Sequence, residues 1–261
     1  MVEIIIVIGI AGIIAAALAS FMRNPVMSYD QTMKRAELAD EAYGIVKKIK
    51  QDVRMALPNS IRVSTVGDKI FLELLTVSNG GKYRSQNNTL GTGDLLNFTS
   101  ADTSFDVLSH SMSFKGGEKI VVANVGALGF DAYSLNNMTN YTGAANTPVS
   151  NIQIASKLFP LESVNENFYV VDKSVSYVCD KTNKTLTKYW GYAISSSQPT
   201  NISAAPLSSS SSSLMAKNVI DCSFVYNEGI NSRNGIVTLL VKLKNNAQEA
   251  TLYTDTYVRN I

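Results

Sequence analysis

The hydrophobic pattern of the chain changes twice, and the first change comes early. Residues 4–22 form an apolar run without a charged side chain, and Glu3 and Arg23 flank it. At about 1.5 Å of rise per residue, a helix over this run would reach almost across a hydrocarbon core of about 30 Å. The pattern therefore predicts a hydrophobic helix over residues 1–25, suited to a membrane or to the core of a filament.

Residues 26–57 instead show the repeat of an amphipathic helix. From Ala39 to Leu57, apolar side chains recur at every third or fourth position, and charged side chains occupy most positions between them. This repeat predicts a second helical segment whose narrow apolar stripe lies on one face of a sheet. The segment should end at Leu57, because Pro58 follows and disfavours helical backbone in the residue before it.

Pro25 lies where the two helical segments meet. If it breaks the helix, Ser28 or Asp30 would cap the second segment. If it does not, one helix of about 50 residues and about 75 Å runs through it, and Pro25 is expected to kink that helix. The pattern leaves both alternatives open.

The remaining residues, 58–261, show the short alternations of β-strands. Turn signals separate them, such as Val66-Gly67-Asp68, Asn79-Gly80-Gly81 and the residues 244–247. Residues 134–151 and 195–213 are expected to be surface loops. The chain is therefore predicted to be α+β, with one long helix packed on an antiparallel sheet domain. Strands are expected at residues 60–65, 69–77, 95–99, 105–107, 119–125, 168–172, 175–179, 186–192, 223–226, 236–243 and 250–258.

Two cysteines, Cys179 and Cys222, are the only ones in the chain. Their spacing is not that of a redox pair, and a zinc site would need more ligands. A disulfide between them would close 42 intervening residues and stabilise the domain by about 3–4 kcal/mol in the loop-entropy model. It would place the domain in an oxidising compartment.

Composition argues against several kinds of chemistry. Lys plus Arg number 23 against 21 for Asp plus Glu, without a basic cluster, so nucleic-acid binding is not expected. The single histidine, His110, lies in a serine-rich segment without a nucleophile motif. Asp102 and Asp106, and the glycines of residues 91–94, lack the pattern of a catalytic carboxylate pair or a phosphate loop. Trp190 is expected to pack on the core, or otherwise to offer a stacking platform. We expect no enzyme, cofactor or metal site.

Glu3 is the feature that separates three interpretations of the apolar run. A cleaved signal peptide would begin with positive charge, whereas here the charge before the run is negative. A permanent membrane anchor leaves a carboxylate beside the hydrocarbon unexplained. A segment that leaves the membrane and packs against similar helices would give Glu3 a partner, the N-terminal ammonium of a neighbouring chain, and the pair would set axial register more than it adds stability.

The residues around Glu3 also resemble a known motif. The string Val2-Glu3-Ile4-Ile5-Ile6-Val7-Ile8, continuing to Gly12-Ile13-Ile14-Ala15-Ala16, is similar to the N-terminal methylation motif of type IV pilins and pseudopilins. The resemblance implies that Glu3 docks subunits during assembly. It implies too that Ile4, Ile8, Ile13, Leu18 and Phe21 lie in the membrane and later in the filament core.

Strings elsewhere in the chain resemble the minor pilins of mannose-sensitive haemagglutinin (MSHA) pili. Among them are Asp102-Thr103-Ser104-Phe105-Asp106-Val107-Leu108, Phe159-Pro160-Leu161, Tyr177-Val178-Cys179 and Tyr189-Trp190-Gly191-Tyr192. The resemblance implies a type IV pilin fold and a non-enzymatic subunit with one membrane helix and a periplasmic domain. Its expected partners are other pilins, bound through the N-terminal helix, and an inner-membrane assembly platform.

The motif of that family normally begins with a basic leader, Gly and Phe-Thr-Leu before Val-Glu. We hypothesise that the encoded protein reads Gly-Phe-Thr-Met-Val-Glu, with translation assigned from an internal methionine, Met1. Processing by the prepilin peptidase depends on that leader, and mass spectrometry of the native N-terminus tests it. The resemblance leaves three functions open: a minor pilin that primes assembly and lies at or near the tip, a major filament subunit, and a pseudopilin of type II secretion.

Overall fold

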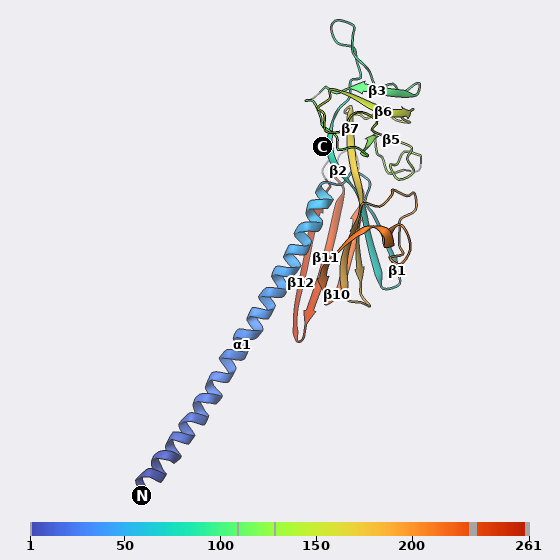
Figure 1. The fold of residues 1–261 in the computed structure, drawn as a ribbon. Coiled ribbons are helices and arrows are strands. Elements are labelled where there is room, and N and C mark those ends of the chain that lie inside the picture. Colours follow the sequence, from blue (N-terminus) through green and yellow to red (C-terminus); the bar gives the residue numbers. More distant parts are fainter. Residues whose placement is uncertain (1, 109, 128, 230–233, 259–261) are drawn as a thin grey trace.

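The computed structural model describes residues 2–108, 110–127, 129–229 and 234–258. A single long helix, α1 (Val2–Arg54), projects from a β-rich domain, and its N-terminal half extends away from every strand (Figure 1). The C-terminal half of α1 lies along the three-stranded sheet that contains β12. The α+β prediction is confirmed at this level: one long apolar N-terminal helix and a mostly antiparallel sheet domain.

Helix α1 runs through Pro25 without a break, so the alternative of two separately capped helices is wrong. The kink at Pro25 stays a prediction. The helix ends at Arg54 rather than at Leu57. The chain leaves the helix there because its next residues pair with a strand instead: the Leu57 amide donates to the Leu75 carbonyl at 2.8 Å, and the Val77 amide donates to the Met55 carbonyl at 2.7 Å.

The largest sheet has seven strands, and all its neighbours are antiparallel. Its main path is β1-β2-β7-β4-β5, and β8 pairs with β7 and with the edge strand β9. A short 3₁₀ helix, η1 (Leu207–Ser209), precedes β9. The strands are β1 (Arg62–Val66), β2 (Lys69–Lys82), β4 (Lys119–Val122), β5 (Met138–Asn140), β7 (Asn167–Asp180), β8 (Thr185–Trp190) and β9 (Ser211–Lys217).

Two smaller sheets complete the domain. One contains β10 (Val219–Asn227), β11 (Ile236–Asn245) and β12 (Gln248–Tyr257) in that order, with β12 at its edge. The other pairs β3 (Asp102–Asp106) with β6 (Asn151–Lys157), at the end of the domain far from the N-terminus (Figure 1). The predicted hairpin of the last two strands is confirmed, and Asn246 adopts a positive φ of 53° in its turn.

Several predicted strand limits are wrong in ways that have a physical cause. Residues 168–172 and 175–179 belong to one continuous strand, β7, because β2 pairs with it along its whole length. The expected turn at Asn79-Gly80-Gly81 instead lies inside β2. The backbone at Gly80 lies so close to β7 that an added Cβ would be 3.0 Å from the Phe168 carbonyl oxygen. Glycine at this position therefore allows β2 to pair closely with β7.

Parts of the two expected loops are strands. Residues 134–151 contain β5 and the first residue of β6. The serine run contributes to β9, which lies at the edge of the sheet and pairs only with β8. Residues 95–99 form no strand; Asn97 there accepts backbone amides of Thr99 and Ser100 in a local turn.

The main core lies where α1 meets both large sheets. The buried stripe of α1 runs from Leu38 to Val53, and Ile49 and Val53 have no exposed surface. It matches the prediction only in part, because the predicted members Ala39 and Tyr43 are exposed and Leu38 is buried instead. The stripe packs against β2, β7 and the whole β10–β11 face. The other members of this core are Leu72, Leu74, Val175, Tyr177, Cys179, Leu186, Ala216, Val219, Cys222, Phe224, Val237, Leu239, Val241 and Leu243.

Candidate functional site

The first candidate site is the apolar half of α1. All side chains described among residues 2–33 are exposed, and no part of the most apolar 18-residue window, whose mean hydropathy is 2.8, is buried. The five positions expected to line a membrane or a filament core, Ile4, Ile8, Ile13, Leu18 and Phe21, are 56–76% exposed. The helix is long and apolar enough to span a membrane.

Such a surface is unstable in water. Burying one Val, Leu, Ile or Phe side chain contributes about 1.5–3 kcal/mol, and soluble monomers rarely expose apolar patches beyond a few hundred Å². The chain's own domain covers none of these side chains, so lipid or the helices of other chains must cover them. The apolar half of α1 is therefore built for contact with something outside the chain.

Glu3 lies in the first turn of α1, the only acidic residue there. The four N-terminal amides of a helix have no partner within it, and the helix dipole favours a negative charge at this end by about 0.3–1 kcal/mol. Among the residues that the structure describes, Glu3 forms no ion pair. The carboxylate is thus presented beside an apolar surface, ready for a charged partner on another chain.

No family model, curated protein or solved structure matches this chain.

The C-terminal half of α1, opposite the exposed apolar half, is held on the domain by polar contacts of Asp52, which we call the Asp52 clamp. Asp52 of α1 accepts a hydrogen bond from the Tyr177 hydroxyl of β7 at 2.7 Å. Its carboxylate also forms an ion pair with Lys188 of β8, whose Nζ lies 2.5 Å away. Tyr177 is fully buried, and the burial and the Asp52 carboxylate together raise its pKa. The clamp and the apolar stripe hold α1 at a fixed position on the sheet.

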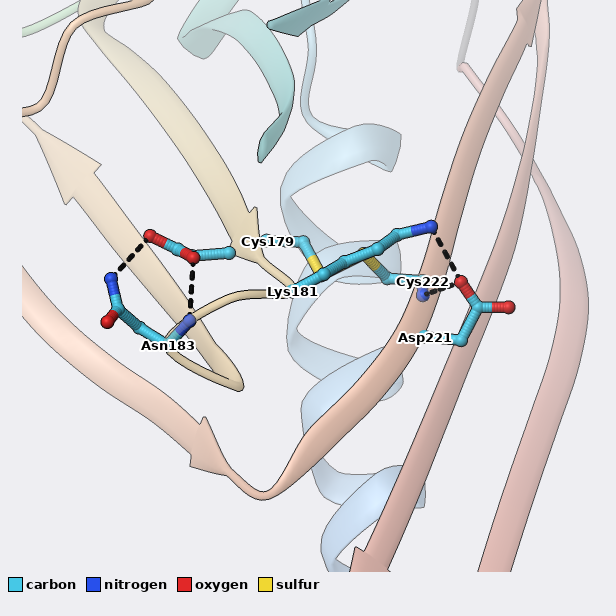
Figure 2. Close-up of a disulfide and its surroundings, with 6 residues drawn as sticks. Cys179, Lys181, Asn183, Asp221 and Cys222 are labelled. Atoms are coloured by element: carbon cyan, nitrogen blue, oxygen red, sulfur yellow. Dashed lines mark hydrogen bonds and ion pairs between the residues drawn. A yellow bond between two sulfur atoms is a disulfide. The ribbon is translucent and has the colours of Figure 1, made fainter. Parts of the chain in front are cut away.

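The disulfide joins the two sheets that hold α1. Cys179 at the end of β7 is bonded to Cys222 of β10, as predicted, and both side chains are buried in the main core. Figure 2 shows the bond beside the ribbon of α1, with ion pair Lys181–Asp221 next to it. The Lys181 Nζ lies 2.8 Å from the Asp221 carboxylate, and hydrogen bonds to Lys181 and to the Cys222 amide lower the pKa of Asp221.

Removing this bond should weaken the junction between the sheets. For a sequence separation of 43 residues, we expect Cys179→Ser/Cys222→Ser to lower the free energy of unfolding by about 4 kcal/mol. Denaturant unfolding of the full chain in detergent measures this, and unfolding of the wild type after reduction serves as the control. A loss below about 1 kcal/mol would mean that the disulfide does not constrain the domain.

A second buried cluster fixes the loop after β8. Glu73 of β2 has no exposed surface, and it accepts hydrogen bonds from Arg62 and, at 2.9 Å, from the Tyr192 hydroxyl. The Arg62 guanidinium lies 3.5 Å from the centre of the Tyr133 ring and donates to the carbonyls of Ser195 and Ser196. Burial raises the pKa of Glu73, and Arg62 partly offsets that rise.

These buried groups predict a loss of stability at alkaline pH. Burial raises the pKa of Tyr133, Tyr177 and Tyr192, and a nearby carboxylate raises each further. The unfolded chain ionises near pH 10 and the folded chain does not, so stability is full below pH 10 and is lost as the pH rises. Above pH 10, each of these tyrosines contributes up to about 1.4 kcal/mol of this loss per pH unit, so the three together contribute up to about 4 kcal/mol per pH unit.

Denaturant unfolding at pH 9 to 11 tests this prediction. Tyr192→Phe should reduce the slope of stability against pH by up to about 1.4 kcal/mol per pH unit, the contribution of one tyrosine that stays protonated in the folded chain. Tyr253→Phe is the matched control, since Tyr253 is 64% exposed, and it should leave the slope unchanged. Equal slopes for Tyr192→Phe and the wild type would contradict the assignment.

The other residues singled out in the sequence have structural places. Asp106 binds Arg84 and Asn151, and Asp102 accepts backbone amides, so the two carboxylates do not face a common site. Trp190 is half-buried and packs on the main core. His110 is exposed. Among the described residues, no group of three or more His, Cys, Asp or Glu side chains could hold a metal ion.

Sequence reasoning missed both buried charge clusters. Asp52 looked like one more solvated charge of the amphipathic helix, and Arg62 and Glu73 like ordinary strand residues. A signal did exist for Glu73: it is the only charged residue between Ile70 and Val77, an otherwise apolar strand. A lone charge in such a strand needs a buried partner.

Proposed function

We propose that this chain is a minor pilin of a type IV pilus of the MSHA kind, which primes filament assembly and lies at or near the tip. Strings within its β-domain, such as Tyr177-Val178-Cys179 and Tyr189-Trp190-Gly191-Tyr192, resemble the minor pilin MshO. The protein has no catalytic role in this proposal. It serves adhesion or surface attachment through the filament that it starts.

One observation carries the proposal: a helix of 53 residues whose first half is apolar, exposed and preceded by Glu3, while its second half is clamped into a β-domain. A simple anchor needs neither a carboxylate at the outer end of its apolar run nor one unbroken helix continuing into the domain. A subunit that exchanges lipid for neighbouring helices needs both. The motif around Glu3 supports the same conclusion.

The proposal also states where the chain resides and what it meets. Before assembly it is a single-pass protein of the bacterial inner membrane with its domain in the periplasm, where the Cys179–Cys222 bond forms. If the native gene encodes the leader, the prepilin peptidase removes it; the assembly platform then extracts the helix. Afterwards the chain is part of an extracellular pilus, in contact with other pilins through α1.

Two alternatives remain, and a gene deletion together with labelling of filaments separates them from the proposal. Deleting the gene should abolish surface filaments while the major pilin stays in the membrane. Labelling the protein along filaments of a complemented strain should give a single signal at one end. Continuous labelling would favour a major subunit, for which the polar Ser/Thr/Asn-rich surface offers some support. Normal filaments with a secretion defect would favour a type II secretion pseudopilin.

A further inference from the structure

An open groove runs between the C-terminal half of α1 and the edge strand β12. Its volume is about 810 Å³, within the range of about 300–1,000 Å³ that is usual for ligand pockets. Lys50 of α1 donates to the Thr254 hydroxyl of β12 at 3.1 Å, so the helix and the strand are joined directly across the groove. We call it the Lys–Tyr groove; its cations and tyrosines are Tyr43, Lys47, Lys50 and Arg54 of α1 and Tyr253 and Tyr257 of β12.

The Lys–Tyr groove is positively charged. None of the described residues that line it is Asp or Glu. Lys47 and Arg54 are exposed, and they form no ion pair in the described part of the chain. The acidic residue nearest to them in the sequence, Asp52, is already bound to Lys188 and Tyr177. The charge of the groove is therefore available to an anion from outside the chain.

The three cations of the groove form a row. Lys47, Lys50 and Arg54 lie at spacings of three and four residues, which places them on one side of α1 over about 10 Å of helix. A charge-assisted hydrogen bond needs the two charged groups in direct contact, so one small anion cannot reach all three cations. A chain with repeated carboxylates can. The row thus favours an extended polyanion over a small anion.

Three exposed tyrosines accompany this row. Tyr43, Tyr253 and Tyr257 are 62%, 64% and 58% exposed. A tyrosine ring is apolar on its faces and has a hydroxyl at its end, so it suits ligands that combine C–H surfaces with hydroxyl groups. Pyranose rings have this combination, whereas a chain of acidic amino acids does not. The tyrosines therefore favour carboxylates that are carried on sugar rings.

Membrane lipid does not explain the charge of the groove. Lys47 follows the last residue of the apolar run, Met22, by 25 positions, which is about 38 Å along a helix. The headgroup region outside the hydrocarbon core is only about 5–8 Å thick on each side. The groove thus lies well beyond the reach of lipid headgroups when the apolar run spans the bilayer.

Two other polyanions fit the groove less well. An acidic peptide that adds a strand to β12 would need free space beside its edge, at a spacing of about 4.8 Å. The bond between Lys50 and Thr254 shows that α1 already lies on this side of β12. A nucleic acid is bound through many phosphate contacts, and three cations in a chain with a net charge of +2 make a small basic footprint.

We propose that the Lys–Tyr groove binds an acidic polysaccharide, a chain of sugar rings that carry carboxylates. Lys47, Lys50 and Arg54 pair with successive carboxylates, and the planar guanidinium of Arg54 can bind both oxygens of one carboxylate. The exposed tyrosines contact the faces of the sugar rings. The inference goes beyond the proposed function and does not depend on it, because it uses only residues of a single chain.

Titration calorimetry of the full chain tests the class of ligand. The chain is kept in micelles of a polyoxyethylene detergent, which has neither charge nor sugar. The probe is hexagalacturonate, and its fully methyl-esterified form keeps the rings and removes the charges. Hexaglutamate has carboxylates without sugar rings, and a hexanucleotide of thymidine has phosphates and flat bases. At low salt, hexagalacturonate should bind at least about tenfold more tightly than each of the other three, and added salt should weaken its binding.

Charge removal tests the row of cations. Lys47→Gln/Arg54→Gln should weaken the binding of hexagalacturonate at least about tenfold, because two charge-assisted contacts are lost. Lys115→Gln/Lys184→Gln makes the same change of charge at two exposed lysines outside the groove, and it should bind like the wild type. Circular dichroism checks that each variant is folded, and Lys47→Gln alone replaces the double variant if it is not.

Ring removal tests the tyrosines. Tyr253→Thr/Tyr257→Thr keeps residues that suit a strand but removes both rings, and it should weaken binding about fivefold or more. Tyr253→Phe/Tyr257→Phe keeps the rings and should retain most of the affinity.

Several results would overturn the inference. They are absence of hexagalacturonate binding, equal binding of hexaglutamate or of the hexanucleotide, and unchanged binding in the charge-removal or ring-removal variant. Binding in micelles does not require a filament, so failure of the proposed function in cells is a separate outcome.

Discussion

Replacing Glu3 by alanine is expected to leave the chain in the membrane and to remove it from filaments. In the membrane the carboxylate needs no partner in the protein, because it lies at the edge of the apolar run. In the proposed filament it would be taken out of water and stabilised by the N-terminal ammonium of a neighbouring chain. Breaking a buried pair costs about 3–5 kcal/mol, so incorporation should fall more than about a hundredfold.

The measurement is the ratio of this chain in sheared filaments to that in membranes, by quantitative mass spectrometry. Glu3→Gln keeps the shape and removes the charge, and it should behave like Glu3→Ala if the charge is what matters. Glu162→Ala, at an exposed position far from α1, is the matched control and should be incorporated normally. Incorporation of Glu3→Ala at the wild-type level would remove the role assigned to this residue.

Replacing Arg62 by methionine is expected to destabilise the domain strongly. It leaves the Glu73 carboxylate fully buried without its cation and removes the bonds to the carbonyls of Ser195 and Ser196. Removing one partner of a buried ion pair costs about 3–5 kcal/mol. Denaturant unfolding of the full chain in detergent at neutral pH measures this loss.

The pH dependence of this variant identifies the cause. Without Arg62, the pKa of Glu73 loses the main influence that lowers it and rises further above 4.5. A folded-state pKa above the unfolded value means that stability is full below the unfolded pKa and is lost as the pH rises through the folded one. The defect should therefore shrink toward pH 4.5. Arg62→Met/Glu73→Leu should recover part of the stability, because no unpaired charge remains. A pH-independent defect without recovery would contradict this explanation.

The sequence was most informative where a pattern extends over many residues. The apolar run, most of the buried stripe of α1 and the last hairpin could be predicted, because each repeats the same side-chain choice over two or more turns or along a strand pair. Cys179 and Cys222 could be paired because the chain offers no other cysteine.

What sequence reasoning missed depends on contacts between distant segments. The Asp52 clamp joins residues 125 and 136 positions apart, and the bonds from Arg62 to the loop after β8 span 133 and 134. The strand β9 consists largely of Ser and small residues and exists because β8 offers it an edge. The end of α1 at Arg54 follows from pairing with β2 rather than from Pro58. No local pattern carries this information.

The most direct test of the account is to ask whether α1 ever lies inside a fibre. Purified, membrane-free filaments can be digested and searched for peptides of residues 2–54, with membranes from the same cells as reference. The account predicts that these peptides are present in the filaments, at a low ratio to the major pilin, and that an antibody to the β-domain labels one end. Recovery of the helix only from membranes, with none in any filament, would contradict it.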